Sequence, residues 1–569
     1  MADSELCALF ASLSIRPRPI KKPRIPVTIE SLPVEVLWEI VCQLHGTDPR
    51  RTGFMFQPVD PALCLVNRRW NQVFTPFLYS HFHFNGDPSK VDRLWNFLDA
   101  ICSNPELASY VRGVVFTTTK AYDATSIEFG DPITFINRLS DLTRKNKFLF
   151  CEALADTGFH TVRDIMVSSA VPSHSDAGGP AGIWERYLAM LSAMIISHCI
   201  NVETAHLHIG QSDCVLREVL QRTLNPPEPY GQYVPKVAFK KLTKLTLAPA
   251  HEVIPGSNNV PLGFGFEFEQ LPALKELVVL KSINWLPVFH HIRNLNKTLP
   301  LDEQIPIPER SSPVERLTLT PLCGIYPLNL SALTCGMKNL RQLILTVPDV
   351  DIFDAGSATY GDVWAALSAV REQLEYLDLR QDVNTRKSVI EEIRWSRNRE
   401  FCTSLSEFTA LRALSISFYI VTWFSCKDHP SGTRMTCHLP PNIRSLGIYT
   451  DLAKMIAKDG ETKDHVMSEL IGTTFNLAVA NHKLDTIYFD KAGAEHLPLE
   501  EFKRKAAVSK IKIHIGVDEC FFHGGKNTVG GQCVYRRFNM QQAETAYAKH
   551  GAKRVLPKGL EVHGHVGEL

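Results

Sequence analysis

The sequence predicts an α/β protein in which a small helical N-terminal module precedes a long, irregular solenoid of stacked repeats. Two observations carry this prediction. Residues 30–84 contain two apolar stripes at helical spacing. From Val202 to Leu484, a short pattern with apolar residues at its first, fourth and sixth positions returns at an average interval of roughly 35 residues, which is typical of stacked repeats.

The composition is that of a globular protein. Hydrophobic residues make up 44% of the 569 residues and charged residues 21%. A net charge of +1 gives no global attraction to nucleic acid or to a membrane, so we expect neither as a partner. The 14 cysteines are scattered without a Cys-x-x-Cys pair, no apolar stretch is long enough to span a membrane, and the N-terminus makes a poor signal peptide. We therefore expect a cytoplasmic or nuclear location, or both.

Residues 1–29 are expected to be a disordered basic tail, because four prolines interrupt regular structure there. The basic residues lie between Arg16 and Arg24. They fit either a nuclear import signal or an ordinary solvated tail in front of a domain.

The first helix of the N-terminal module is expected to begin at Pro33, which suits the first helical position because its missing N–H would be unpaired there. Leu37, Ile40, Val41 and Leu44 then form one apolar face. A second helix is expected further on, with an apolar face made of Leu63, Val66, Trp70, Val73 and Phe77. Such short helices must pack on each other and on a partner to bury their apolar faces.

The stretch LPVEVLWEIVCQL, followed by ALCLVNRRWNQVFTPFLYSHFHF, resembles an F-box of the fungal type. The resemblance implies that this module binds the Skp-type adaptor of a cullin-based ubiquitin ligase. The segment His45–Pro61 is longer than the usual turn of the family. An ordinary small helical domain remains the alternative. The residues that the resemblance places toward the adaptor or in the domain core are Leu32, Pro33, Leu37, Ile40, Leu65, Val66 and Trp70.

Residues 85–200 are expected to form a helical linker and the first repeat-like units. Asp87 and Pro88 form a helix-start signal. The apolar stripe that follows this signal comprises Val91, Leu94, Trp95, Leu98 and Ile101. A second stripe comprises Trp184, Tyr187, Leu188, Leu191 and Ile195.

Residues 201–516 are expected to form the repeat array, and residues 517–569 a C-terminal cap and tail. In each unit the last two apolar residues alternate as on one face of a strand, and parallel strands of successive units can pair. The pattern resembles a degenerate leucine-rich-repeat horseshoe, because the expected Asn or Cys after each unit is missing. An irregular α/β domain is the alternative. The units begin at Val111, Val202, Leu242, Leu274, Val314, Leu340, Leu374, Leu411, Ile443, Leu484 and Val508.

Strand positions that alternate with the buried leucines are expected to line one exposed face and to bind a protein target. Tyr and Arg are enriched at binding hot spots, which favours a docking surface around Tyr376, Arg380 and Tyr488. Solvated strand residues are the alternative. The whole expected face comprises Arg316, Thr318, Gln342, Tyr376, Asp378, Arg380, Ser415, Tyr449, Tyr488 and Asp490.

The sequence shows no catalytic motif, so we expect no catalytic residues, no cofactor and no metal site. The resemblance implies the substrate-recognition subunit of a cullin-type ubiquitin ligase, with the adaptor, and through it a cullin, and an unknown protein substrate as partners. The alternative function is a leucine-rich-repeat-like interaction scaffold that acts outside a ligase. A third possibility is an enzyme in the region after the F-box.

Overall fold

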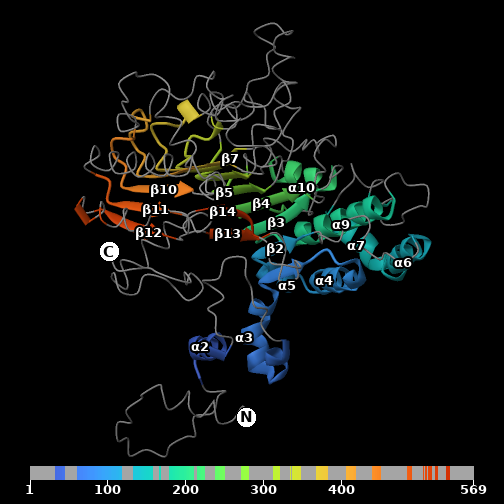
Figure 1. Ribbon diagram of the computed structural model, residues 1–569. Helices are drawn as coiled ribbons and strands as arrows, with labels where there is room; N and C mark the ends of the chain where they lie inside the picture. Colours follow the sequence, from blue (N-terminus) through green and yellow to red (C-terminus); the bar gives the residue numbers. More distant parts are fainter. Residues whose placement is uncertain are drawn as a thin grey trace, which may run out of the picture. The chain divides into compact units, whose positions relative to one another are not determined.

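A computed structural model of the chain divides into two compact units, Met1–Leu78 and Tyr79–Leu569 (Figure 1). The residues that it describes are 32–44, 61–117, 132–157, 166–167, 179–209, 214–224, 237–249, 271–280, 312–320, 334, 336–347, 367–381, 405–417, 439–449, 483–489, 504, 507–508, 511–515, 519–522 and 533–537. The expected basic cluster, the long segment after the first helix and Asp490 lie outside these residues.

The N-terminal unit is helical. It contains α2 (Val34–Leu44), the 3-10 helix η2 (Pro61–Leu65) and most of α3 (Arg68–Tyr79). The expectation of one continuous helix over the second apolar stripe is wrong. The helical structure ends after η2, and α3 begins after Asn67. The side-chain Oδ1 of Asn67 accepts a hydrogen bond from the backbone N–H of Trp70 at 2.9 Å. An asparagine side chain that accepts this bond acts as the N-cap of α3, so the two helical segments are separate.

The second unit is built on one sheet of 12 strands, all parallel and ordered in space as in the sequence (Figure 1). A second, antiparallel pair is formed by β13 (Glu519–Phe522) and β14 (Cys533–Arg537). The strands of the large sheet are β1 (His81–Phe84), β2 (Gly113–Phe116), β3 (Thr204–Ile209), β4 (Lys244–Pro249), β5 (Glu276–Leu280), β6 (Arg316–Thr320), β7 (Gln342–Val347), β8 (Tyr376–Gln381), β9 (Ala413–Ser417), β10 (Ser445–Tyr449), β11 (Thr486–Phe489) and β12 (Lys512–Ile515).

The repeating apolar pattern accounts for this sheet. In β4, Leu245 and Leu247 are fully buried, and they align with Leu277 and Val279 of β5. From the Val111 unit to the Leu484 unit, the first apolar residue precedes its strand, as Leu242 does, and is also buried. The expected strands from the Val111 unit to the Leu484 unit are confirmed, and the sheet is compatible with a repeat solenoid.

The last expected unit is misplaced by two residues. The structure aligns Ile513 with Ile487 and Ile515 with Phe489 of the neighbouring strand β11. Val508, which was expected to be the first buried residue of the unit, is 83% exposed. Because apolar residues recur at every second position here, the pattern fits two frames, and pairing with β11 selects the later one.

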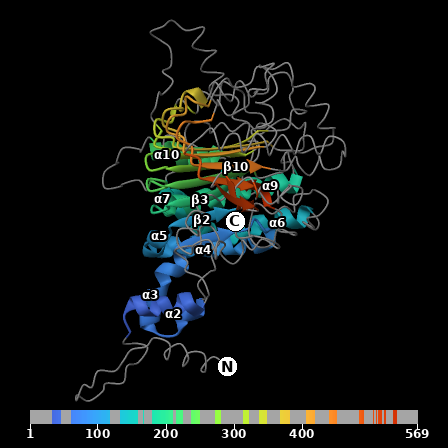
Figure 2. The ribbon, with the colours of Figure 1, turned by 60° about the vertical axis from the view of Figure 1, so that its left-hand side comes forward.

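Helices pack beside the first strands of the sheet (Figure 2). Both apolar stripes predicted for this region are confirmed, because every residue in them is buried. Inside this layer the indole N–H of Trp95 donates to the Tyr187 hydroxyl at 3.0 Å, which joins α4 to α9. The helices are η3 (Pro88–Lys90), α4 (Asp92–Ser103), α5 (Pro105–Tyr110), α6 (Pro132–Lys145), α7 (Lys147–Thr157), α9 (Gly179–His198) and α10 (Cys214–Leu224).

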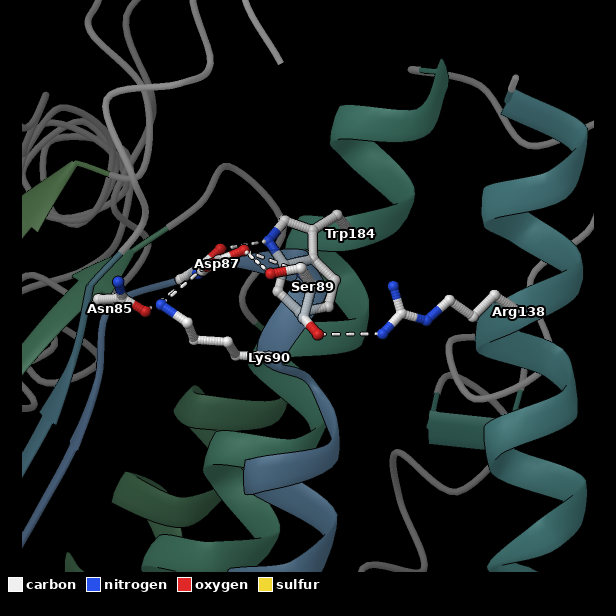
Figure 3. Close-up of polar contacts among 7 residues, drawn as sticks. Asn85, Asp87, Ser89, Lys90, Arg138 and Trp184 are labelled. Carbon is white, nitrogen blue, oxygen red and sulfur yellow. Dashed lines mark hydrogen bonds and ion pairs between the residues drawn. The ribbon is translucent and has the colours of Figure 1, made fainter. Parts of the chain in front are cut away.

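The link from β1 into this layer is fixed by the expected helix-start signal. Asp87 Oδ1 accepts the backbone N–H of Ser89 at 2.9 Å and caps η3 (Figure 3). The Trp184 indole N–H donates to the carbonyl oxygen of Gly86, which has a φ of 77°. This left-handed conformation is open to glycine at little cost and turns the chain toward α4.

Candidate functional site

The N-terminal unit has a small apolar core formed between its helices. Leu37 of α2 is fully buried, and it packs with Trp70, Val73 and Phe74 of α3 and with Cys64 of η2. The rings of Trp70 and Phe74 lie 5.2 Å apart between centroids. The core therefore depends on both helices at once.

Two hydrogen bonds fix the segments that carry the predicted adaptor residues. The guanidinium of Arg69 donates to the carbonyl oxygen of Leu32 at 2.6 Å, which holds the turn before α2 against α3. The side-chain amide of Asn71 donates to the carbonyl oxygen of Cys64 at 3.2 Å, which holds η2 against the same helix.

The predicted adaptor residues fall into two groups. Leu37, Ile40 and Trp70 are buried inside the unit. Leu65 and Val66, in contrast, expose 83% and 56% of their surface at the break between η2 and α3. Leu32 is half-buried, and Pro33 is exposed with its neighbour Val34. Among the predicted adaptor residues, the side chains available to a partner are thus those of the two turns, while Leu37, Ile40 and Trp70 lie inside the unit.

The predicted target-binding residues do lie on one face of the large sheet. The register aligns Arg316 of β6 with Tyr376 of β8 in one row, through Gln342 of β7. A second row contains Asp378 and Tyr488. The alternating pattern therefore predicts correctly which residues share the face opposite the leucines.

The expected exposure of this face is wrong for five of its residues, because Thr318, Asp378, Ser415, Tyr449 and Tyr488 are all buried. Asp378 is fully buried and Tyr488 is 2% exposed. Tyr376 and Arg380 are half-buried, and Arg316 is exposed. Thr318, also in the second row, is buried as well, so burial extends along the row. Period-two alternation shows which residues share a face, but it does not show whether that face meets solvent.

The buried carboxylate of Asp378 is the centre of a polar and aromatic cluster. The hydroxyl of Tyr449, two strands away on β10, donates to Asp378 Oδ2 at 2.7 Å, and the hydroxyl of Tyr376 donates to the same oxygen at 3.3 Å. The guanidinium of Arg380 lies 5.1 Å from the centroid of the Tyr449 ring, which is within the range of a cation–π contact. Burial, together with the nearby negative charge of Asp378, raises the pKa of Tyr449 well above its usual value. Tyr449 therefore stays a neutral donor to the carboxylate.

Sequence reasoning missed one member of this region, His514 of β12. Its ring stacks on the ring of Tyr488, with centroids 5.1 Å apart. Burial lowers the pKa of His514 to about 4, so the imidazole is neutral at physiological pH. The residue was missed because the last repeat was placed two positions too early, which left His514 outside the predicted strand.

Arg316 belongs to a ladder of charges along the rows near the starts of the strands. It contacts Glu276 at 3.5 Å, and Glu276 also contacts Lys244 at 2.7 Å. One position before the strands, Arg341 pairs with Glu375 at 3.2 Å. Opposite charges on neighbouring parallel strands favour this register, although exposed pairs contribute little stability individually.

Within the described residues, no three His, Cys, Asp or Glu side chains come together as a metal site, and no helix is long and apolar enough to cross a membrane. No protein-family model matches the chain, and the search of curated proteins finds no relative.

Proposed function

We propose that the N-terminal unit is an F-box-like module that binds a Skp-type adaptor, and that the chain is the substrate-recognition subunit of a cullin-type ubiquitin ligase. The observation that supports this proposal best is the exposure of Leu65 and Val66 beside an ordered core. Two neighbouring aliphatic side chains in water favour burial against a partner.

The large sheet supports the second half of the proposal. A long parallel sheet with one repeating unit per strand presents side chains from many repeats, which suits recognition of a protein target. Holding a target and a conjugating enzyme in one assembly raises their effective concentration without any bond chemistry by this chain.

The test is co-purification of the full chain with a Skp-type adaptor, comparing wild type with Leu65→Asp. A carboxylate buried without a partner in the complex costs several kcal/mol, so we expect affinity to fall on the order of a thousandfold. The matched control is Val508→Asp, because Val508 is also 83% exposed but lies in the second unit.

Leu65 is a sharper position for this test than Leu37. An aspartate at the fully buried Leu37 would disrupt the core, so lost binding would not distinguish an interface from unfolding. If wild type does not bind the adaptor, or if Leu65→Asp binds as well as Val508→Asp, the adaptor proposal fails. A binding scaffold outside a ligase would then be the better interpretation of the repeat sheet.

A further inference from the structure

The corner between α6 and α7 presents an exposed aromatic side chain on a fixed backbone. The two helices are separated by the single residue Asn146. Its backbone N–H and its side-chain amide both donate to the carbonyl oxygen of Leu142, at 3.0 and 2.9 Å, and its own carbonyl accepts the N–H of Phe150 at 2.9 Å. Phe148, in the first turn of α7, is 92% exposed, whereas Phe150 is buried.

A shallow hollow of about 430 Å³ lies along α6 next to this corner. Its lining residues recur at helical spacing, so they form one face of α6, opposite the buried face that contains Phe135 and Leu139. The hollow ends at Lys145, three residues before Phe148. The lining residues are Thr134, Asn137, Arg138, Asp141, Leu142 and Lys145.

Cations gather around the hollow and the corner. Arg138 donates to the carbonyl oxygen of Ser89 at 3.0 Å (Figure 3). Its guanidinium also lies 3.6 Å from the carboxylate of Asp92, so two contacts hold this side chain. Lys145 and Lys147 are exposed and make no ion pair with any residue in the described part of the chain. They flank the corner on both sides.

Two further charged side chains that the structure describes on this face are Arg144, which pairs with Asp141 at 3.1 Å, and Glu152, which is exposed on α7. Among the described residues, no carboxylate forms an ion pair with either lysine, so their positive charge is available to a ligand. A ligand that complements the surface must be negatively charged and must offer an apolar group to Phe148.

We propose that the α6–α7 corner is a docking surface for an acidic peptide segment of a partner protein, with an apolar side chain packed against Phe148 and carboxylates facing Lys145 and Lys147. Phenylalanine is one of the aromatic residues that are enriched at protein interfaces, and the two lysines give the surface the charge that selects an acidic partner. The hollow along α6 gives a second apolar or polar side chain a place to enter.

A peptide fits this surface better than an anionic lipid membrane does. A flat headgroup layer at this corner would meet Lys145, Lys147 and Phe148 together with the exposed carboxylates of Asp141 and Glu152, which repel anionic headgroups. An extended peptide can follow the hollow and place its carboxylates selectively. The inference does not depend on adaptor binding, because the corner lies in the second unit and its ligand is read out directly.

The test first selects phage-displayed random dodecapeptides for binding to the immobilised full chain. The recovered sequences are then synthesised with a fluorescent label, and their affinity for the chain is measured by fluorescence anisotropy. We expect recovered peptides to be enriched in Asp or Glu next to an aliphatic or aromatic residue. We expect Phe148→Ala, and separately the double variant Lys145→Glu/Lys147→Glu, each to weaken binding about tenfold or more. All three side chains are exposed, so these variants should keep the fold.

The matched controls are Val508→Ala for the exposed apolar side chain and Lys240→Glu for the exposed cation, and both should leave peptide affinity within about twofold of wild type. Recovered peptides without acidic bias, or affinities that the corner variants do not change, would overturn the proposal. So would a result in which the corner variants abolish binding to phosphatidylserine vesicles and leave the peptides unaffected, because the surface would then bind lipid.

Discussion

The hydroxyl of Tyr449 on β10 reaches across β9 to donate a 2.7 Å hydrogen bond to the fully buried carboxylate of Asp378 on β8. Ser415 of β9 lies between them in the sheet, fully buried, and its hydroxyl makes no hydrogen bond within the part of the chain that the structure describes. The shorter of the two hydrogen bonds to Asp378 Oδ2 therefore comes from a strand two positions away, and it spans three consecutive repeats on one face.

Tyr449→Phe tests this relationship. The change leaves Asp378 Oδ2 with the longer 3.3 Å contact from Tyr376, and loss of a donor to a buried carboxylate should cost about 1–3 kcal/mol of unfolding free energy. Urea unfolding and hydrogen exchange of peptides from β8–β10 measure this loss. The control is Tyr110→Phe, whose hydroxyl bonds Glu106 at the exposed surface and should matter little. If the two changes lower the free energy of unfolding equally, the buried hydrogen bond contributes no more stability than the exposed one.

The strands were predictable because the alternation of apolar residues within each strand determines which of its faces packs against the core. Leu377 and Leu379 of β8 alternate in the same way as Leu245 and Leu247 of β4, and the local pattern fixes which side faces the core. The state of the opposite face was not predictable in this way. Burial of Asp378 depends on neighbours such as Tyr449, which lies 71 residues away in the chain.

The N-terminal module likewise has features that its sequence predicts and features that depend on longer-range contacts. Its helical content follows from apolar spacing, but the break at Asn67 depends on a capping bond that competes with continuing the helix. Because of that break, Val66 lies in water rather than on the core face. Spacing alone did not separate the residues that form the core from those that can contact a partner.

Leu37→Ala and Leu65→Ala should therefore differ sharply in their effect on the N-terminal unit. Removing the fully buried Leu37 side chain should cost about 2–5 kcal/mol, because a cavity remains in a small core, while truncating the exposed Leu65 should change stability little. Hydrogen exchange of peptides from α2 and α3 in the full chain measures both. Similar protection in the two variants would contradict the division into core and surface residues.

Acid should destabilise the second unit before its ordinary carboxylates are protonated. Burial, with smaller contributions from the charges of His83 and Lys244, lowers the pKa of His206 to about 4 from its usual value near 6.5. The unfolded chain takes up a proton below pH 6.5 and the folded chain only near pH 4, so stability falls as the pH drops through this interval. For a fully buried group the loss between pH 7 and pH 5 is about 2 kcal/mol.

Urea unfolding at pH 7 and at pH 5 checks this effect in wild type and in His206→Gln. Glutamine does not titrate, so the difference between the two pH values should shrink, whatever the variant costs at pH 7. Burial lowers the pKa of His81 and of His514 to about 4 as well, so part of the dependence should remain in the variant. An unchanged pH difference would show that the imidazole of His206 is protonated as easily in the folded chain as in the unfolded one.

Gly113→Ala should weaken the pairing of β1 with β2 for a steric reason that a second change can relieve. The register places His81 opposite Gly113, and a Cβ at position 113 would lie 2.2 Å from Cδ2 of the His81 ring and 2.9 Å from Oγ1 of Thr204. The ring is also held by Ser80, whose Oγ lies 2.9 Å from His81 Nδ1, so moving it breaks a contact. We expect Gly113→Ala to cost about 1–3 kcal/mol, as overpacking of a closed site does.

Adding His81→Ala to Gly113→Ala should recover most of this loss, because the ring that blocks the new methyl group is gone and the Thr204 hydroxyl can rotate away. Comparing both single variants with the double variant in a cycle of urea unfolding measurements isolates the steric term. The expected interaction energy is favourable, with the double variant more stable than the sum of the two single changes predicts. If the two changes are additive, the ring of His81 does not occupy the space above Gly113, and glycine is required there for another reason.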